Sequence, residues 1–538
     1  MININKYSKL LVGMFIVSSM YSYSQNPTTP PAPAPTQPLE LPNFIIEGKE
    51  QLNVQAGVKQ FPNRPASLTK SEIDSINPVQ KLQALLLPPK SMPTELLNKS
   101  YQKGYLRADI GNYTSANLLA GYEYNEREFT LFGKGFFNYS DGYLKNTDKS
   151  GGGIDLSLFY IAPKKFWVFG GSKTTASIAY DKHLYKLYAM DSVAESDAGL
   201  LKLSVDSEGE FQGYSFNTGA SFKAFSLEHN TNEGFENTFN GYLSIKTGID
   251  KIEFCAKSEL QLSAISNNSS NLFNAGAGVK FLLDDMSFDL SGAFQSVGST
   301  DDVQRANIML SAGFDYRLNS DFTIKAKLLT GFDNQQLENA WRLNRYMVNN
   351  PTIDFSYDKA ISAYIQYHPN QIIMANFGLK KSATDRQKYF EMDSLKRYDL
   401  KYADAEGFSI FAKGSVELTP EDKLYAEINF KNNTVVDSTS NKLPFVPSFT
   451  FDIAYDRNWT NEFGTKIEMN YVGNRYTDLN NKNEVDAFIN LKMCLEYKLS
   501  NSFKIYGILD NLLNSDIYIW DKYKEREIYI AAGILWQF

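Results

Sequence analysis

The C-terminal stretch Arg526-Glu-Ile-Tyr-Ile-Ala-Ala-Gly-Ile-Leu-Trp-Gln-Phe538 alternates between two kinds of side chain. Counted back from Phe538, every second residue is apolar, through Trp536 to Ile528. A period of two is that of a β-strand, because successive side chains of a strand point to opposite faces. The stretch therefore predicts a terminal strand with one face against a non-aqueous medium.

The same alternation recurs upstream, from Tyr101 onward, in segments that are separated by turn-forming residues. Representative segments are Lys251–Leu262, Asp321–Leu328, Lys423–Phe430 and Phe449–Tyr455. One face of each segment is apolar, and the other face is polar or charged. Residues 101–538 are therefore expected to form a single antiparallel β domain.

The connections between these segments alternate between short turns and mostly longer loops. The short turns are Asn125–Arg127, Ala162–Lys165, Ser207–Glu210, Gly248–Lys251, Leu283–Asp285, Asn319–Asp321, Pro369–Gln371, Thr419–Asp422, Asn458–Asn461 and Ser500–Ser502. The loops include Asp141–Gly151, Asp181–Asp197, Asn334–Pro351, Ala383–Glu406, Val436–Pro444 and Thr477–Glu484. We interpret Glu210–Glu228 as one long strand and Gln387–Tyr402 as loop. This pattern predicts an all-β, antiparallel transmembrane β-barrel of about 22 strands, with turns on one side of the membrane and loops on the other.

The composition agrees with a barrel and excludes several other classes. The chain contains 33 Tyr and 37 Phe, and 14% of its residues are aromatic, yet its mean hydropathy is −0.35. Barrels carry aromatic girdles at both membrane interfaces around a polar interior, whereas a helical membrane protein would be more apolar. A net charge of −7 without a Lys and Arg cluster argues against nucleic-acid binding. A soluble propeller or large sandwich is the alternative architecture.

The N-terminal region is interpreted as three segments that precede the barrel. Residues 1–24 have the layout of a secretory signal peptide, in which lysines and a short apolar run precede a cleavage point near Ser24. Residues 25–42 are rich in proline and are expected to form an extended linker. Residues 43–100 are expected to form a short plug-like or periplasmic segment with one helix.

A series of short motifs toward the C-terminus resembles a known family. Leu443–Pro447 precedes one strand, Tyr471–Asp478 ends the next, and Asp510–Asn514 forms a turn before the final strand with Trp536 and Phe538. This order resembles the end of a TonB-dependent receptor barrel. The resemblance implies a place among the lipids of the outer membrane of a Gram-negative bacterium. The terminal aromatic residues Trp536 and Phe538 are similar to the signal that barrel-assembly machinery recognises.

The N-terminal region both matches and departs from this family. Phe44, Ile45, Ile46, Glu47 and Gly48 resemble the short apolar TonB box that precedes the plug of such receptors. The segment before residue 101 is too short for the complete plug of the family. The resemblance implies uptake of an unidentified small solute, with TonB or another periplasmic or outer-membrane partner. A plugless passive pore and a structural or assembly component are the alternatives.

The sequence contains no recognisable catalytic or metal-binding motif. His183, His229 and His368 share no metal-ligand or triad spacing, and we find no nucleophile elbow or phosphate-binding loop. The protein is therefore expected to be no enzyme and to hold no cofactor or metal ion. Cys255 and Cys494 are expected on opposite walls of the barrel, too far apart for a disulfide.

Aromatic residues in the expected loops are candidates for contact with a sugar or a chelate. Four of them, Trp341, Tyr346, Trp520 and Tyr523, are retained as hypothetical ligand contacts, and Tyr185 and Tyr188 belong to the same group. Packing between loops or a place in the interface girdle is the favoured interpretation. Residues 335–348 are expected to contain a short helix.

Overall fold

The computed structural model describes residues 103–538, except 231, 267, 300–304, 334–335, 371 and 437–440. The expected signal peptide, the linker and the 43–100 segment, including Phe44, Ile45, Ile46, Glu47 and Gly48, lie outside the described residues. None of the described helices is long and apolar enough to cross a membrane.

The main sheet of the described residues has 22 strands. Its first half consists of β1 (Gly104–Gly111), β2 (Ser115–Glu126), β3 (Phe129–Ser140), β4 (Lys149–Ile161), β5 (Lys173–Leu187), β6 (Ala194–Phe211), β7 (Tyr214–His229), β8 (Asn232–Ile249), β9 (Ile252–Ile265), β10 (Asn268–Leu282) and β11 (Met286–Ser299). Its second half consists of β12 (Arg305–Arg317), β13 (Phe322–Asp333), β14 (Ser356–Tyr367), β15 (Ile373–Met392), β16 (Tyr398–Thr419), β17 (Asp422–Val435), β18 (Phe449–Asn458), β19 (Phe463–Val472), β22 (Phe488–Lys498), β23 (Phe503–Asp510) and β26 (Tyr529–Gln537).

Smaller elements lie in the connections. Helix α4 (Leu337–Leu343) lies between β13 and β14, and the 3-10 helix η3 (Trp167–Phe169) lies between β4 and β5. Two separate hairpins pair β20 (Arg475–Tyr476) with β21 (Glu484–Val485), and β24 (Tyr518–Trp520) with β25 (Tyr523–Lys524).

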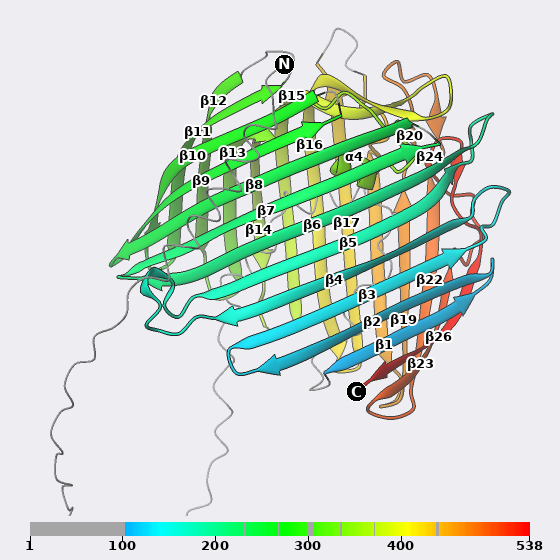
Figure 1. Ribbon diagram of the computed structural model, residues 1–538, viewed down its shortest axis with the longest axis horizontal. Coiled ribbons are helices and arrows are strands. Elements are labelled where there is room, and N and C mark those ends of the chain that lie inside the picture. The colour runs from blue at the N-terminus through cyan, green and yellow to red at the C-terminus, as the bar shows by residue number, and fades with distance from the viewer. Residues whose placement is uncertain are drawn as a thin grey trace, which may run out of the picture. The chain divides into compact units, whose positions relative to one another are not determined.

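The sheet closes on itself as an antiparallel barrel (Figure 1). Each strand pairs with the next strand of the sheet in chain order, and β1 pairs with β26 from Tyr105↔Gln537 to Gly111↔Ala531. Closure leaves the described 22-stranded sheet without an unpaired edge strand, which is a requirement for a sheet within a membrane. The predicted 22-stranded barrel is confirmed.

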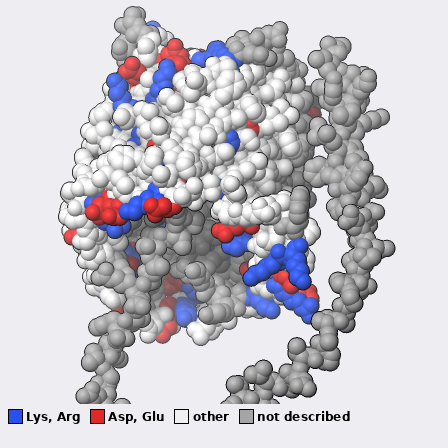
Figure 2. Space-filling view, turned by 90° about the vertical axis from the view of Figure 1, so that its left-hand side faces the viewer, with Lys and Arg blue, Asp and Glu red and all other residues white. Residues whose placement is uncertain are grey.

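The terminal strand shows how the alternating sequence builds the wall. Ile530, Ile534 and Trp536 of β26 point outward and are 37–52% exposed, whereas Tyr529 and Leu535 point inward and are buried. The predicted two-faced strand is confirmed. In Figure 2 a wide area of the wall carries few charged residues, and Lys, Arg, Asp and Glu gather along its edges. An apolar outer wall with charged rims is suited to a lipid bilayer.

Phe538 packs at the seam between the first and last strands. Its backbone N–H and C=O bond to the C=O and N–H of Gly104, at 2.9 and 2.8 Å. A Cβ atom on Gly104 would lie 2.6 Å from the Phe538 ring, so only glycine leaves room for that ring. The ring also contacts Trp536, with centroids 4.5 Å apart. The candidate assembly signal therefore lies on the outward face of the closed seam.

One end of the barrel, which we call the turn end, carries mainly tight turns. Gln212 and Gly213 join β6 to β7 with φ of 52° and 84°, as a two-residue hairpin turn requires. The predicted turn Ser207–Glu210 was therefore misplaced, because β6 continues in regular pairing to Phe211. The predicted tight turn Ala162–Lys165 is also wrong, since the connection runs from 162 to 172 and contains η3.

The opposite end, which we call the loop end, differs most from the expectation. The segment Gln387–Tyr402 is not a loop, because β15 and β16 pair through it as far as Met392↔Tyr398. A β-bulge between Thr384 and Gln387, with Arg386 at φ 61°, shifts the register there. The bulge adds one residue to β15, because three steps from Thr384 to Gln387 oppose two steps from Ala405 to Ala403. The extra residue interrupts the alternation of side chains, so the strand pattern of this segment is hard to recognise in the sequence.

Candidate functional site

The loop end carries a compact cover, which we call the loop cap. It comprises α4 and its flanking residues, the ends of several strands, the β15–β16 hairpin beyond the bulge, and the β20–β21 and β24–β25 hairpins. One hydrophobic core joins them. Its buried members are Tyr185, Leu187, Ala194, Ala198, Leu200, Phe225, Leu227, Ile265, Leu337, Ala340, Trp341, Tyr346, Met347, Ile353, Phe390, Tyr398, Leu400, Phe445, Val485, Trp520 and Tyr523. Segments that are far apart in the sequence therefore form one packed unit over this end of the lumen.

Helix α4 is short, so its stability comes from packing and ion pairs. Leu337 and Trp341, four residues apart, place their side chains on one buried face. On the polar side Arg342 Nε lies 2.6 Å from Glu338 Oε1. Acidic and basic residues at the first and last turns also suit the helix dipole. The predicted helix within residues 335–348 is confirmed.

A buried ion-pair network fixes the start of α4 to the barrel wall. The Gln336 side chain makes no capping hydrogen bond, and Glu236 of β8 accepts the backbone N–H of Glu338 at 3.0 Å in its place. Lys223 Nζ lies 3.0 Å from both Glu236 Oε1 and Glu338 Oε2. Burial alone would raise the pKa of Glu338, but Lys223 and Arg342 hold that pKa below its ordinary value.

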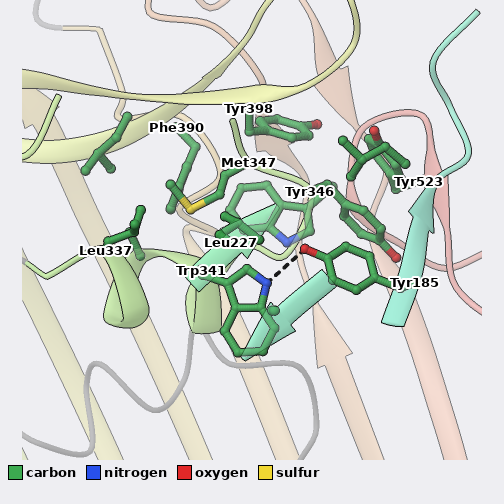
Figure 3. Packing of buried hydrophobic residues seen from close by; sticks show 14 of the residues in the cluster. Tyr185, Leu227, Leu337, Trp341, Tyr346, Met347, Phe390, Tyr398 and Tyr523 are labelled. Atoms are coloured by element: carbon green, nitrogen blue, oxygen red, sulfur yellow. Dashed lines mark hydrogen bonds between the residues drawn. The ribbon is translucent and has the colours of Figure 1, made fainter. Parts of the chain in front are cut away.

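Trp341 connects α4 to strand β5. Its indole N–H donates to the Tyr185 hydroxyl at 2.9 Å (Figure 3). That hydroxyl in turn donates to the Arg345 carbonyl at 2.7 Å. The indole ring also packs against Phe225, with centroids 5.4 Å apart. Buried indole and phenol groups normally need such partners, so this chain of bonds fixes the position of the helix.

Tyr346 and Tyr523 form the closest aromatic pair of the cap. Their rings are stacked with centroids 3.8 Å apart, and Tyr188 packs edge-on against Tyr523 at 5.1 Å. The Tyr523 hydroxyl donates to the Lys396 carbonyl at 2.9 Å. Burial raises the pKa of Tyr346 and of Tyr523, so both phenols stay neutral at physiological pH.

Trp520 is the centre of a second aromatic group. Its ring lies 5.1 Å from Phe390, 5.1 Å from Tyr398 and 4.8 Å from Phe445, between centroids. Tyr398 also donates from its hydroxyl to the Asp521 carbonyl at 2.9 Å. These contacts fix the tip of the β15–β16 hairpin to the connection between β23 and β26, which is the last connection of the chain.

The bulge of β15 borders a cavity of about 730 Å³ at the loop end. Arg386 forms an ion pair with Asp354, and its backbone N–H donates to Asp404 Oδ1 at 2.8 Å. Arg305 and Tyr402 also line the cavity. The cavity combines cationic, acidic and aromatic groups, which are suited to a polar solute.

All four hypothetical ligand contacts lie in the loop cap. Trp341, Tyr346, Trp520 and Tyr523 are between 0 and 9% exposed. Packing between loops accounts for their present contacts, and a solute would reach them only after the cap opens. Ligand contact stays a hypothesis.

Sequence reasoning missed many members of the cap core, among them Phe390, Tyr398 and Phe445, and it missed the ion-pair anchor of α4. Phe390 and Tyr398 belong to the segment interpreted as loop, and Phe445 lies in the motif Leu443–Pro447. The density of aromatic residues in these segments was the available signal. Lys223 and Glu236 gave no signal, because charged residues on strands are common in barrels.

His229 makes hydrogen bonds within the protein. His229 pairs with Ser196 Oγ at 2.9 Å through Nδ1, and with the Met347 carbonyl at 2.9 Å through Nε2. Within the described part of the chain, no group of three or more His, Cys, Asp or Glu could hold a metal ion. Cys255 on β9 and Cys494 on β22 form no disulfide with each other.

The barrel is similar to solved structures of transport proteins and receptors. The FrpB iron transporter from Neisseria meningitidis matches with a TM-score of 0.68 at 10% identity, over 82% of each chain. The siderophore receptor PiuA from Acinetobacter baumannii matches with a TM-score of 0.66 at 9% identity, over 82% of each chain. The pyoverdine outer membrane receptor FpvA from Pseudomonas aeruginosa matches with a TM-score of 0.66 at 10% identity, over 82% of this chain and 79% of that one.

Comparison of the sequence gives no such match, since no family model and no curated protein matches it. At these low identities the structural likeness shows the fold. Within the described residues the chain is a closed barrel of 22 antiparallel strands, and it shares this barrel fold with the transporter and the two receptors.

Proposed function

We propose that the protein takes part in the uptake of a small solute across the outer membrane of a Gram-negative bacterium, as a barrel of the TonB-dependent receptor type. The loop cap is the observation that carries this proposal. Its core joins α4, the β15–β16 hairpin and the last connection of the chain over the loop end of the lumen. A mouth covered by a packed core is suited to gated passage, and it argues against a passive pore.

The solute class follows from the neighbours and from the cavity at the bulge. The neighbours include an iron transporter and a siderophore receptor, so a metal chelate is the first class to test. The cavity offers Arg305, Arg386 and Tyr402 for a polar or anionic chelate. Trp341 and Tyr523 become available to the same solute when the cap opens.

Partners of the barrel follow from the same proposal. Phe44, Ile45, Ile46, Glu47 and Gly48 are the proposed contact with TonB or another periplasmic partner, and Trp536 and Phe538 are the proposed signal for barrel-assembly machinery. Deleting residues 43–48 tests the first contact, because uptake that is unchanged by this deletion would contradict it.

Two measurements test the uptake proposal. In planar bilayers the full-length protein is expected to show no steady open current, and a large constant conductance would establish the passive pore instead. In cells, loss of the protein is expected to lower accumulation of radiolabelled ferric siderophores, which the wild-type chain restores. Unchanged accumulation of every chelate tested would contradict the proposal.

A structural or assembly role in an outer-membrane complex is the second candidate function. The extent of aromatic packing in the cap favours it, since a core this well packed also suits a permanently closed barrel. A partner that copurifies in constant ratio, together with unchanged chelate uptake, would support this role.

A further inference from the structure

The connection 162–172 between β4 and β5 is a folded loop at the turn end of the barrel. Its ends are tied by a hydrogen bond from Ala162 N–H to the Ser172 carbonyl at 2.9 Å, and Gly171 N–H donates to the Ala162 carbonyl at 3.0 Å. Gly171 has a φ of 78°, which glycine adopts without strain. The loop therefore has a defined conformation although it is longer than the neighbouring turns.

This loop packs against the outward face of the wall. The Phe169 ring lies edge-on to Phe216 of β7, with centroids 5.5 Å apart. Phe216 pairs with Gly209 of β6, and a Cβ atom on Gly209 would lie 2.8 Å from the Cβ of Ser172. Gly209 has the same outward orientation as Val205, four residues away, which is 51% exposed. The missing side chain of Gly209 thus makes room for the loop beside the lipid-facing surface.

The outward residues of β6 indicate how deep the loop lies relative to the hydrocarbon core of the membrane. Asp197 points outward near the loop end, Leu203 and Val205 follow, and the buried Ser207 is the first polar residue of this face toward the turn end, ahead of Gly209 and Phe211. The interval from Asp197 to Ser207 agrees with the roughly 9–11 residues that a tilted strand needs to cross the hydrocarbon core. The loop packs beside Gly209, immediately beyond that interval, so it lies at the level of the lipid headgroups.

The exposed side chains of the loop suit this position. Phe166 is 59% exposed and Phe169 is 36% exposed. Lys164 and Lys165 are exposed and form no ion pair with any residue that the structure describes. Aromatic rings favour the membrane interface, and lysines attract anionic headgroups there.

We propose that loop 162–172 is an interfacial anchor, which binds anionic phospholipid headgroups of the bilayer leaflet at the turn end. Lys164 and Lys165 bind the headgroup phosphate, and Phe166 inserts beside the glycerol region. Continuity with the lipid-facing wall favours a lipid over a periplasmic protein as the partner. This inference rests on the outer-membrane location in the proposed function.

The test compares full-length variants in nanodiscs of phosphatidylcholine with and without phosphatidylglycerol, with retained lipid counted by native mass spectrometry. The double variant Lys164→Gln/Lys165→Gln is expected to lower retention of phosphatidylglycerol by about 5-fold for each lysine removed. The matched control Lys145→Gln/Lys482→Gln changes two exposed lysines at the loop end. It is expected to leave retention at the turn end unchanged.

A second variant tests the position of the loop without changing its charge. Gly209→Leu fills the space against Ser172 and should therefore displace the loop and lower phosphatidylglycerol retention. An unchanged heat-modifiable band on a gel would confirm that the barrel of this variant is still closed. Wild-type retention in the double lysine variant would overturn the anchor and would point to a periplasmic protein as the partner. Failure of the wild-type protein to enter either nanodisc would instead overturn the outer-membrane assignment.

Discussion

Replacing Trp341 by alanine should open the loop cap while the barrel stays intact. Trp341 is only 8% exposed, packs against Phe225, and donates its N–H to the Tyr185 hydroxyl. The substitution leaves a cavity between α4 and β5, and the Tyr185 hydroxyl loses one of its two partners. The strand pairs of the sheet do not depend on this side chain.

The size of the effect follows from burial. Truncation of a buried Trp to Ala costs about 3–5 kcal/mol, of which the hydrogen bond accounts for about 1 kcal/mol. If the whole loss acts on the equilibrium between the closed and the open cap, the open fraction rises by about a hundredfold to about 4,000-fold, at about 1.4 kcal/mol per factor of ten. Trp341→Phe keeps an aromatic ring and should cost about 1–2 kcal/mol.

Trypsin cleavage of the protein in vesicles measures cap opening, because Arg342 and Arg345 lie beside Trp341. When opening is fast relative to cleavage, the cleavage rate follows the open fraction. The order of rates should be Trp341→Ala, then Trp341→Phe, then wild type. Bilayer conductance should show brief open events in the alanine variant alone.

The matched control is Trp459→Ala, since Trp459 lies at the turn end and is 55% exposed. It should leave cleavage and conductance at the wild-type level. If Trp341→Ala gives the same cleavage rate as Trp459→Ala, the cap core does not hold the loops together and the reasoning is refuted.

Two further predictions concern pH and the seam. Lys223 and Arg342 lower the pKa of Glu338 below its ordinary value of 4.5. The ion pairs therefore stabilise the cap fully above about pH 4.5 and lose their contribution as the pH falls through the lowered pKa. Hydrogen exchange of residues 336–347, corrected for intrinsic rates, should increase in that acid range and not between neutral pH and pH 5, and equal protection at all these values would contradict the assignment. Phe538→Ala should lower the yield of heat-modifiable barrel in cells, because the ring fills the space that Gly104 leaves at the seam, and an unchanged yield would count against the assembly signal.

The barrel could be predicted from the sequence because its determinants are local. The alternation of side chains on β26 indicates the two faces of the barrel wall. The short turns between strands indicate one end of the barrel. The strand character of Gln387–Tyr402 was missed, because the bulge at Arg386 breaks the period of two and tertiary contacts decide which face is buried. The 162–172 connection is longer than the predicted turn Ala162–Lys165, because the residues after Lys165 form η3 and not the start of the next strand.

The sequence indicates some of the aromatic residues that form the cap, but it does not indicate how they pack. Trp341, Tyr346, Trp520 and Tyr523 were identified as unusual loop aromatics, but their stacking depends on loops that are distant in sequence. The anchor formed by Lys223 and Glu338 joins a strand to a helix across more than a hundred residues. No local pattern reports such a pair.

The span of the loop cap along the chain has a consequence for biogenesis. Tyr185 bonds to Trp341, and Tyr346 stacks on Tyr523, which lies in the last connection before the final strand. The core therefore cannot be completed until almost the whole polypeptide has been synthesised and inserted. Until then its aromatic side chains stay exposed, which makes an incomplete barrel prone to aggregation and accessible to chaperones and proteases. Completion of the cap therefore buries these side chains and ends the stage at which the chain is most prone to aggregation and proteolysis.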